Sequence, residues 1–202
     1  MTDKIDFTTK FPDLYTAQHR IATVVPVPSL TFLTTQGVWH HTTSDTLEAA
    51  MQTLYGIAFS LKVYLKRKEA EWFTDYLMPP LEALRTNTQA PKEKRERQLL
   101  LVQPGTVTEK DATHVFEVAR MKHQDRMLPT VKHMAFKESA CIQTLHIGSY
   151  DAEQETLAFL HDEAKKAGYK LSWPHHEIYL NDKRRTASDK LQTIIRYQVK
   201  PL

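Results

Sequence analysis

Two glutamates of this 202-residue chain stand in short segments whose other residues suit a buried strand. Glu177 lies in the segment "HHEIYL" (175–180), and Glu82 lies in "PPLEAL" (79–84). Because side chains alternate along a strand, Glu177 shares one face with His175 and Tyr179. A carboxylate among apolar neighbours either reaches water or has a partner that offsets its desolvation. We therefore take both glutamates as candidate site residues; the alternative is that both face water on the outer side of a sheet.

Paired carboxylates perform two kinds of chemistry, and the sequence leaves both open. If the two glutamates lie close together, one with a raised pKa donates a proton while the other, ionised, orients a water. Neither glutamate is assigned to the acid or to the base role. If a glutamate instead lines an aromatic hollow, it attracts a cation, and flat ligands stack on tyrosine and tryptophan. The first arrangement predicts an enzyme, and the second predicts a binding protein.

Hydrophobic periodicity predicts the elements that must position these residues. The strongest pattern is a helix over 44–69, in which Leu47, Leu54, Leu61 and similar residues recur every three or four positions. A second helix begins after Thr108, which is a favourable N-cap residue. In all, helices are predicted over 44–69, 107–126 and 152–168, and strands over 21–30, 30–39, 71–77, 79–84, 97–104, 139–150, 169–173, 175–180 and 191–199.

These elements read as a strand–helix–strand–strand unit that occurs twice. The segment "TFLTTQGVW" matches "IQTLHIGSY" in length, glycine position and final aromatic residue, and "MPPLEAL" aligns with "WPHHEIY". That alignment sets Glu82 over Glu177. Such a repeat predicts an α+β fold of duplicated βαββ units (an SHS2-like repeat) with antiparallel sheets, in which equivalent strands meet near a pseudo-twofold axis. The predicted boundaries are a lead-in over 1–29, repeat one over 30–104, a linking helix over 107–126 and repeat two over 139–200.

Composition and charge narrow the class of protein. The chain is 41% hydrophobic and carries a net charge of +3, and no apolar run approaches the roughly 18 residues of a membrane span. The charged start lacks a signal peptide pattern, and the single Cys141 excludes an intramolecular disulfide. These features predict a cytoplasmic protein without a membrane partner. The basic segments 91–97 and 181–185 read as solvated loops, so we expect no direct binding of nucleic acid.

Neither a metal nor a cofactor is predicted. The adjacent histidine pairs His40–His41 and His175–His176 would point to opposite faces of a strand, which prevents chelation by either pair. A zinc site needs three or four ligands that converge from several segments. The turn "IGSYD" has one glycine and no lysine, so it is not a phosphate-binding loop.

Several segments, taken together, resemble the GyrI-like small-molecule-binding domain. The matching stretches are "LEAAMQTLYGIAFSLKVYLK", "MPPLEAL", "LLLVQPGTVTEKD", "CIQTLHIGSYDAEQETLAFLHDEAKKAGY" and "HHEIYLNDKRRTASDKLQTIIRYQV", which together run from about residue 30 to residue 202. The resemblance implies that 30–202 is one such domain, with helices around a central ligand cleft. The family's glutamate falls on Glu177, with Glu82 as its counterpart in the first half. The remaining positions assigned to the cleft are Trp39, Tyr55, Trp72, Tyr150, His175 and Tyr179.

The resemblance implies two functions. The first is the binding of flat, apolar and often cationic small molecules, as in multidrug sensing or sequestration and in effector domains related to AraC-type and MerR-type regulators. The alternative is a hydrolase that opens the cyclopropane ring of cyclopropanoid genotoxins, using Glu82 and Glu177. One departure is "RTNT" (85–88), where relatives often carry tryptophan, so that side of the cleft is expected to be more open or more polar. Besides a small-molecule ligand, the sequence leaves open a separate regulator as a partner and does not identify it.

Overall fold

A computed structural model describes residues 4–38, 45–68, 73–85, 96–124 and 127–202. The chain forms two compact units, which are described separately. Unit 1 comprises Met1–Phe7, Leu30–Pro79 and Asn87–Phe136, and unit 2 comprises Thr8–Ser29, Pro80–Thr86 and Lys137–Leu202. Helices and strands occur in both units, which confirms the predicted α+β class.

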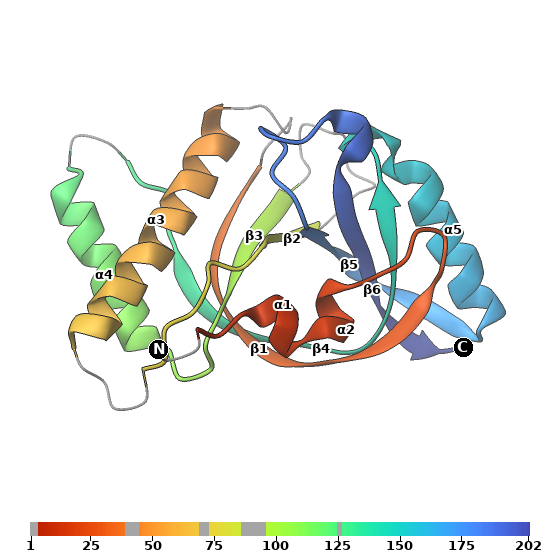
Figure 1. The fold of residues 1–202 in the computed structure, drawn as a ribbon, viewed down its shortest axis with the longest axis horizontal. Coiled ribbons are helices and arrows are strands. Elements are labelled where there is room, and N and C mark those ends of the chain that lie inside the picture. The colour runs from red at the N-terminus through yellow and green to blue at the C-terminus, as the bar shows by residue number, and fades with distance from the viewer. Residues whose placement is uncertain (1–3, 39–44, 69–72, 86–95, 125–126) are drawn as a thin grey trace. The chain divides into compact units, whose positions relative to one another are not determined.

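Unit 1 packs two helices beside a pair of strands (Figure 1). Strand β1 (Thr23–Val38), which belongs to this unit from residue 30 on, pairs antiparallel with β3 (Glu96–Gln103), in a register that runs from Thr31–Gln103 to Val38–Glu96. Helix α3 (Asp45–Arg67) buries the predicted leucine stripe, including Leu54 and Leu61, neither of which has exposed surface. Helix α3 therefore turns its apolar stripe towards the core of this unit and contacts β3.

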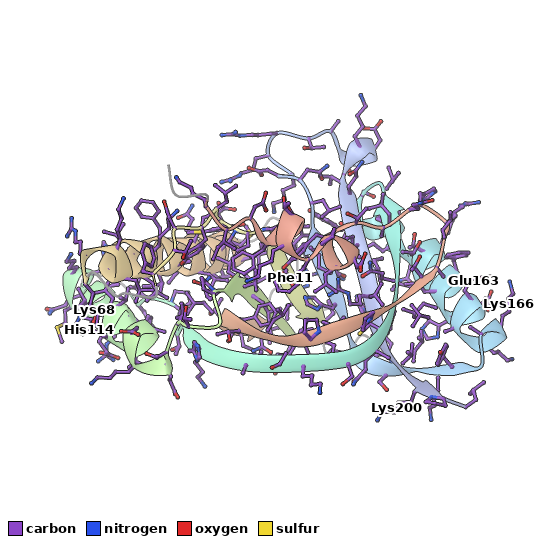
Figure 2. All side chains as sticks on the ribbon, turned by 60° about the horizontal axis from the view of Figure 1, so that its bottom comes forward. Phe11, Lys68, His114, Glu163, Lys166 and Lys200 are labelled. Carbon is purple, nitrogen blue, oxygen red and sulfur yellow. The ribbon has the colours of Figure 1, made fainter. Side chains whose placement is uncertain are left out.

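Helix α4 (Glu109–Lys122) begins as predicted, because the Thr108 side chain accepts a hydrogen bond from the Asp111 backbone N–H. Asp111 also pairs with Lys68 near the end of α3, with Nζ and Oδ1 3.0 Å apart. Figure 2 shows Lys68 and His114 close together at this end of the two helices. There the His114 ring packs against Tyr64, with the ring centroids 5.0 Å apart. These polar and ring contacts fasten α4 to α3.

The segment 71–77 does not form the strand predicted for it in its described part. Within residues 73–77, Tyr76 makes an isolated bridge to Ile5, and no strand is assigned. The segment is held instead by Lys62, whose Nζ lies 2.8 Å from Asp75 Oδ1 and also contacts the Tyr76 carbonyl. Backbone hydrogen bonds from the Ile5 N–H to the Asp75 carbonyl and from the Leu77 N–H to the Ile5 carbonyl, together with the Lys62 contacts, hold this segment in place of a strand.

Unit 2 is built on a four-stranded antiparallel sheet in the order β2, β5, β6, β4. Helix α5 covers one face, and its Leu160 and Ala164 pack on Ile142, Ile195 and Tyr197 of the sheet. Its outer side carries an exposed ion pair between Glu163 and Lys166 (Figure 2). The elements of this unit are α2 (Pro12–Tyr15), β2 (Leu81–Arg85), α5 (Glu153–Lys166), β5 (Tyr169–Tyr179), β6 (Gln192–Pro201) and, from residue 137 on, β4 (Lys132–Ile147).

Strand β5 covers two segments that the sequence analysis predicts as separate strands. The predicted strands 169–173 and 175–180 are one strand, which is interrupted by a register shift between Ser172 and His175. The peptide bond between Trp173 and Pro174 within this shift is cis. The shift sets His175, Glu177 and Tyr179 opposite Tyr197, Ile195 and Thr193 of β6.

The order of elements along the chain is strand–helix–strand–strand twice, as β1–α3–β2–β3 and β4–α5–β5–β6, with α4 between the two sets. The compact units do not follow this order, because β2 of the first set pairs with β5 of the second. The boundaries of the two repeats therefore stay a prediction. Within the described residues, we found no helix with the length and apolar character needed to cross a membrane.

Candidate functional site

Glu82 and Glu177 lie on paired strands but point to opposite faces of the unit 2 sheet. Glu82 stands opposite Ile178, and Glu177 stands opposite Ala83. Residues that face each other across a ladder project to the same side, so a one-position offset sends the two carboxylates apart. The expectation that the two glutamates converge is therefore wrong. Alignment of the two repeats places Glu82 and Glu177 in equivalent positions. In the paired strands, however, Glu82 stands opposite Ile178, which is one residue beyond Glu177.

The face covered by α5 carries Glu177, whose side chain is completely buried. Its Oε1 lies 2.5 Å from Arg85 Nε and 3.0 Å from His175 Nε2. Its Oε2 accepts a 2.6 Å hydrogen bond from the Tyr179 hydroxyl. The prediction that His175, Glu177 and Tyr179 share a face is confirmed by these contacts. The Arg85 contact is an ion pair outside hydrogen-bond geometry, because its N–H does not point at the oxygen.

Arg85 also reaches a second carboxylate. Its Nη2 lies 3.3 Å from Oε2 of Glu153, the first residue of α5, and the Glu153 side chain is buried. Strand register supports this placement, since Arg85 stands opposite His175 at the end of β2. We refer to Arg85, Glu153, His175, Glu177 and Tyr179 as the Glu177 cluster. Sequence reasoning missed Arg85 and Glu153, although an acidic residue in the first turn of a helix is a recognisable signal.

The electrostatics of this cluster keep Glu177 ionised. Burial alone would raise the pKa of the carboxyl group. The Arg85 guanidinium, together with hydrogen bonds from His175 and Tyr179, outweighs burial and holds the pKa of Glu177 well below its usual range. In turn Glu177 and Glu153 raise the pKa of Arg85 against the opposing effect of burial. With its pKa held low, Glu177 is ionised in the resting protein and does not start a reaction as the proton donor.

Aromatic rings extend the Glu177 cluster towards the surface. The Tyr150 and Tyr179 rings meet edge to face, with centroids 5.4 Å apart, and both side chains are half-buried. Trp173 packs edge to face on Tyr197 at 5.4 Å while 47% of its surface stays exposed. Burial, followed by the charges of Glu153 and Glu177, raises the pKa of Tyr150 to about 12. Predicted wall residues Tyr150 and Tyr179 therefore adjoin the buried anion, together with Trp173, which was not assigned to the site.

The opposite face of the sheet holds a second group of buried charges. His176 Nδ1 lies 2.9 Å from Glu138 Oε2, and its Nε2 lies 2.8 Å from Glu82 Oε2. Arg196 Nη1 lies 3.5 Å from the same Glu138 oxygen, and the Tyr15 hydroxyl donates a 2.8 Å hydrogen bond to Glu82 Oε1. Each of the four strands contributes one charged residue. We refer to Tyr15, Glu82, Glu138, His176 and Arg196 as the Glu82 cluster.

Charge balance explains how the Glu82 cluster tolerates burial. Burial lowers the pKa of His176, but Glu138 and then Glu82 outweigh it and raise that pKa to about 9. His176 and Arg196 in turn hold the pKa of Glu138 below its usual value. Two carboxylates are therefore matched by an imidazolium and a guanidinium at neutral pH. A buried set of charges is tolerated when each charge has a partner of opposite sign.

The Glu82 cluster also holds the N-terminal segment of unit 2 on the sheet. Arg196 donates to the Leu14 carbonyl, while its Nε–H donates to Gln143 Oε1 at 2.9 Å. The Gln143 amide then donates to the carbonyls of Asp13 and Thr16, at 2.8 and 3.1 Å. These contacts close the face above Glu82, so Glu82 lies in a structural core. Tyr15, Glu138 and Arg196 were not predicted as partners of Glu82.

The other predicted cleft residues are not part of either cluster. Tyr55 is a half-buried residue of α3 in unit 1, and Trp39 and Trp72 lie outside the described residues. A half-open groove of about 200 Å³ lies between α3 and α4, and it contains none of the predicted site residues. Its lining includes Gln52, Thr53, Gly56, Ile57, His123 and Leu128. In the part of the chain that the structure describes, no group of three or more His, Cys, Asp or Glu side chains is arranged to hold a metal ion.

This chain is similar to a known family and to solved structures. Residues 97–200 match the model of the GyrI-like small-molecule-binding domain. A hydrolase from Listeria innocua is 30% identical over 98% of this chain and 100% of its own, with a TM-score of 0.85. An uncharacterized conserved protein from the same organism is 31% identical with the same coverage and TM-score.

More distant structures share the fold alone. The C-terminal domain of EcmrR is 11% identical, with a TM-score of 0.54 over 90% of this chain and 98% of that domain. A search among curated proteins found no match. On the family match and the similarity at 30% identity over nearly the whole length, the chain belongs to the family of GyrI-like small-molecule-binding domains.

Proposed function

We propose that the protein hydrolyses a small electrophilic molecule on the face that carries Glu177, and that its substrates bear a strained cyclopropane ring conjugated to a carbonyl group. The observation that carries the proposal is the 2.6 Å hydrogen bond that the half-buried Tyr179 donates to the fully buried, ionised Glu177. The likeness to a Listeria innocua hydrolase supports the reaction class. The family resemblance supports the substrate class.

In this scheme Tyr179 links the ligand to the buried anion. Because its O–H donates to Glu177, the Tyr179 oxygen offers a lone pair to an attacking water. As the water oxygen bonds to the ring carbon, one water proton passes to the Tyr179 oxygen and the tyrosine proton passes to Glu177. The broken ring bond leaves its electron pair in the conjugated carbonyl, which takes up a proton, and Glu177 returns its proton to solvent. The net change is the addition of one water.

The low pKa of Glu177 makes it a weak base, so the scheme depends on the reactivity of the substrate. General base catalysis is most effective when the pKa of the base is near the working pH. A strained ring that opens into a conjugated carbonyl is a sufficiently good electrophile for a weak base, whereas an unstrained ester or amide is not. We therefore expect the protein to convert cyclopropanoid compounds and not ordinary esters or amides.

A mass-spectrometric assay tests the proposal. Purified protein is incubated with a cyclopropane-fused dienone in ¹⁸O-labelled water, and the ring-opened product is expected to carry one labelled oxygen. Glu177→Gln and Tyr179→Phe are expected to lower kcat/KM by about 100-fold or more, because each interrupts the proton path. Tyr169→Phe is the matched control, since it removes a phenol from the same strand away from Glu177 and should leave the rate unchanged.

Two results would count against the hydrolase. One is the absence of labelled product with the wild-type protein, and the other is unchanged turnover in both the Glu177 and the Tyr179 variants. A second candidate function, the reversible binding of flat compounds without turnover, is supported by the exposed Trp173 ring and the Tyr150–Tyr179 pair, which offer stacking surfaces. Saturable binding of the dienone without product would favour that candidate.

A further inference from the structure

His146 is a buried residue near the end of β4 that the proposed proton path does not use. It stands opposite Thr193 of β6, and Thr193 stands opposite Tyr179 of β5. Side chains that face each other across a ladder project to the same side of a sheet, so His146 and Tyr179 lie in one row on the face that carries Glu177. Only 3% of His146 is exposed, so its ring nitrogens need partners within the protein.

Both ring nitrogens of His146 have such a partner. Nε2 lies 3.0 Å from the carbonyl oxygen of Ser149, and Nδ1 lies 2.8 Å from Thr156 Oγ1. Because a carbonyl oxygen can only accept, Nε2 carries the hydrogen and donates it. In the neutral ring Nδ1 then accepts from the hydroxyl of Thr156, which belongs to the first turn of α5. One side chain therefore joins β4, the turn after it and α5.

The Ser149 carbonyl is the group through which His146 reaches Tyr150, since it belongs to the peptide bond between Ser149 and Tyr150. The same oxygen accepts a 3.0 Å hydrogen bond from the Ala152 N–H, which closes the short 3₁₀ helix η2 (Tyr150–Ala152). Two donors thus hold the peptide plane that precedes Tyr150. From this position the Tyr150 ring meets the Tyr179 ring edge to face, with the centroids 5.4 Å apart.

We propose that His146 is a positioning residue for the reaction on the Glu177 face, and that it acts through Tyr150 on Tyr179. The inference rests on the proposed function, because it takes Tyr179 as the group that passes a proton to Glu177. An edge-to-face neighbour restricts rotation of the Tyr179 ring, and the Tyr179 hydroxyl must stay aligned with Glu177 Oε2 for the transfer. A misplacement of about 1 Å can lower a rate by about 100-fold.

Two substitutions separate the two contacts of His146. Glutamine places its amide nitrogen near the position of Nε2, whereas asparagine places its polar atoms near the position of Nδ1. His146→Gln therefore keeps a donor for the Ser149 carbonyl, and its kcat should stay within about threefold of the wild-type value. His146→Asn keeps only the Thr156 contact, and its kcat should fall by about tenfold or more.

Thr156→Val is the matched control, because it removes the other partner of the ring and leaves the Ser149 contact in place. It should lower the melting temperature without a comparable loss of kcat. Thermal unfolding of each variant checks that it is folded. If His146→Asn does not fold, His146→Phe takes its place, since phenylalanine keeps a buried ring and offers no donor to Ser149.

A second readout needs no substrate. Proton NOEs between the Tyr150 and Tyr179 rings should persist in His146→Gln and weaken in His146→Asn. Because these NOEs report the ring contact directly, they test the positioning even if the wild-type protein forms no labelled product. In that case the proposed reaction fails and the placement of Tyr150 by His146 is judged on the NOEs alone.

Three results would overturn the inference. The first is equal kcat in His146→Gln and His146→Asn, and the second is a loss of kcat in Thr156→Val as large as that in His146→Asn. The third is an unchanged set of NOEs between Tyr150 and Tyr179 in His146→Asn. Each would mean that the Ser149 contact does not place the Tyr150 ring for the reaction.

Discussion

Glu82 and Glu177 occupy neighbouring strands one register position apart, and each is buried on its own side of the sheet. This offset separates two kinds of charged cluster. Glu82 pairs with His176 beneath the N-terminal segment of unit 2, and Glu177 pairs with Arg85 beside aromatic rings that reach the surface.

The pH dependence of turnover should lack an acid limb from Glu177. Arg85 keeps the pKa of Glu177 well below the usual glutamate value of about 4.3, so Glu177 stays ionised as the pH falls through that value. In Arg85→Met the strongest opposing charge is gone, and burial should move the limb of the kcat/KM profile to higher pH. Arg85→Lys serves as the control with the charge retained. Identical profiles for the wild-type and Met proteins would show that Arg85 does not set this ionisation.

Stability should fall as pH rises through the titration of His176. The pKa is about 9 in the folded protein and about 6.5 in an unfolded chain. Between these values the folded state binds the extra proton, so the stabilisation is complete below about pH 6.5 and is lost as pH rises through about 9. The loss is on the order of 3 kcal/mol in total. Urea unfolding at pH 6.5, 7.5, 8.5 and 9.5 would measure it, with about 1.4 kcal/mol lost per pH unit within the window.

A pair of histidine variants identifies the titrating group behind that loss. His176→Gln should be less stable than the wild-type protein at pH 7. Its free energy of unfolding should change little between pH 7 and 9. His114→Gln removes an exposed histidine of unit 1 and should keep the wild-type slope. If the slope survives in His176→Gln, another group carries the pH dependence.

Tyr15→Phe should destabilise the protein by about 1–3 kcal/mol, because a buried carboxylate oxygen loses its donor. The Tyr15 hydroxyl lies 2.8 Å from Glu82 Oε1, and burial, followed by the Glu82 charge, raises the pKa of Tyr15. Tyr169→Phe is again the matched control and should change the free energy of unfolding by much less. Urea denaturation at pH 7 provides the measurement. Equal effects of the two substitutions would mean that the Tyr15 hydrogen bond adds no stability.

Thr108→Ala should cost about 1 kcal/mol, because the Asp111 backbone N–H loses its capping acceptor at the start of α4. Thr106→Ala, two residues earlier in an exposed turn, is the control and should be nearly neutral. Because this cap lies in unit 1, the substitution should leave ligand binding on the Glu177 face unchanged. A loss of binding would link α4 to the site in a way that this cap does not explain.

Local patterns predicted most elements because they depend on neighbours in the chain. The leucine stripe of α3 and the Thr108 cap of α4 follow from helix geometry, and both appear as expected. The same local logic failed for 71–77, whose apolar and aromatic composition suits a strand. In its described part, that segment is held by Lys62 and a bridge to Ile5. Composition could not reveal that these distant residues would replace a ladder.

The sequence alone determined that His175, Glu177 and Tyr179 share a face, because side-chain alternation is a property of one strand. Tertiary structure decided which partner each glutamate meets. A one-residue change in the register of β2 against β5 would bring Glu82 to the same face of the sheet as Glu177. Register depends on pairing between segments that are far apart in the chain. For the same reason only the folded chain brings Arg85 to Glu177 and Glu153, so that each buried carboxylate contacts a counter-ion.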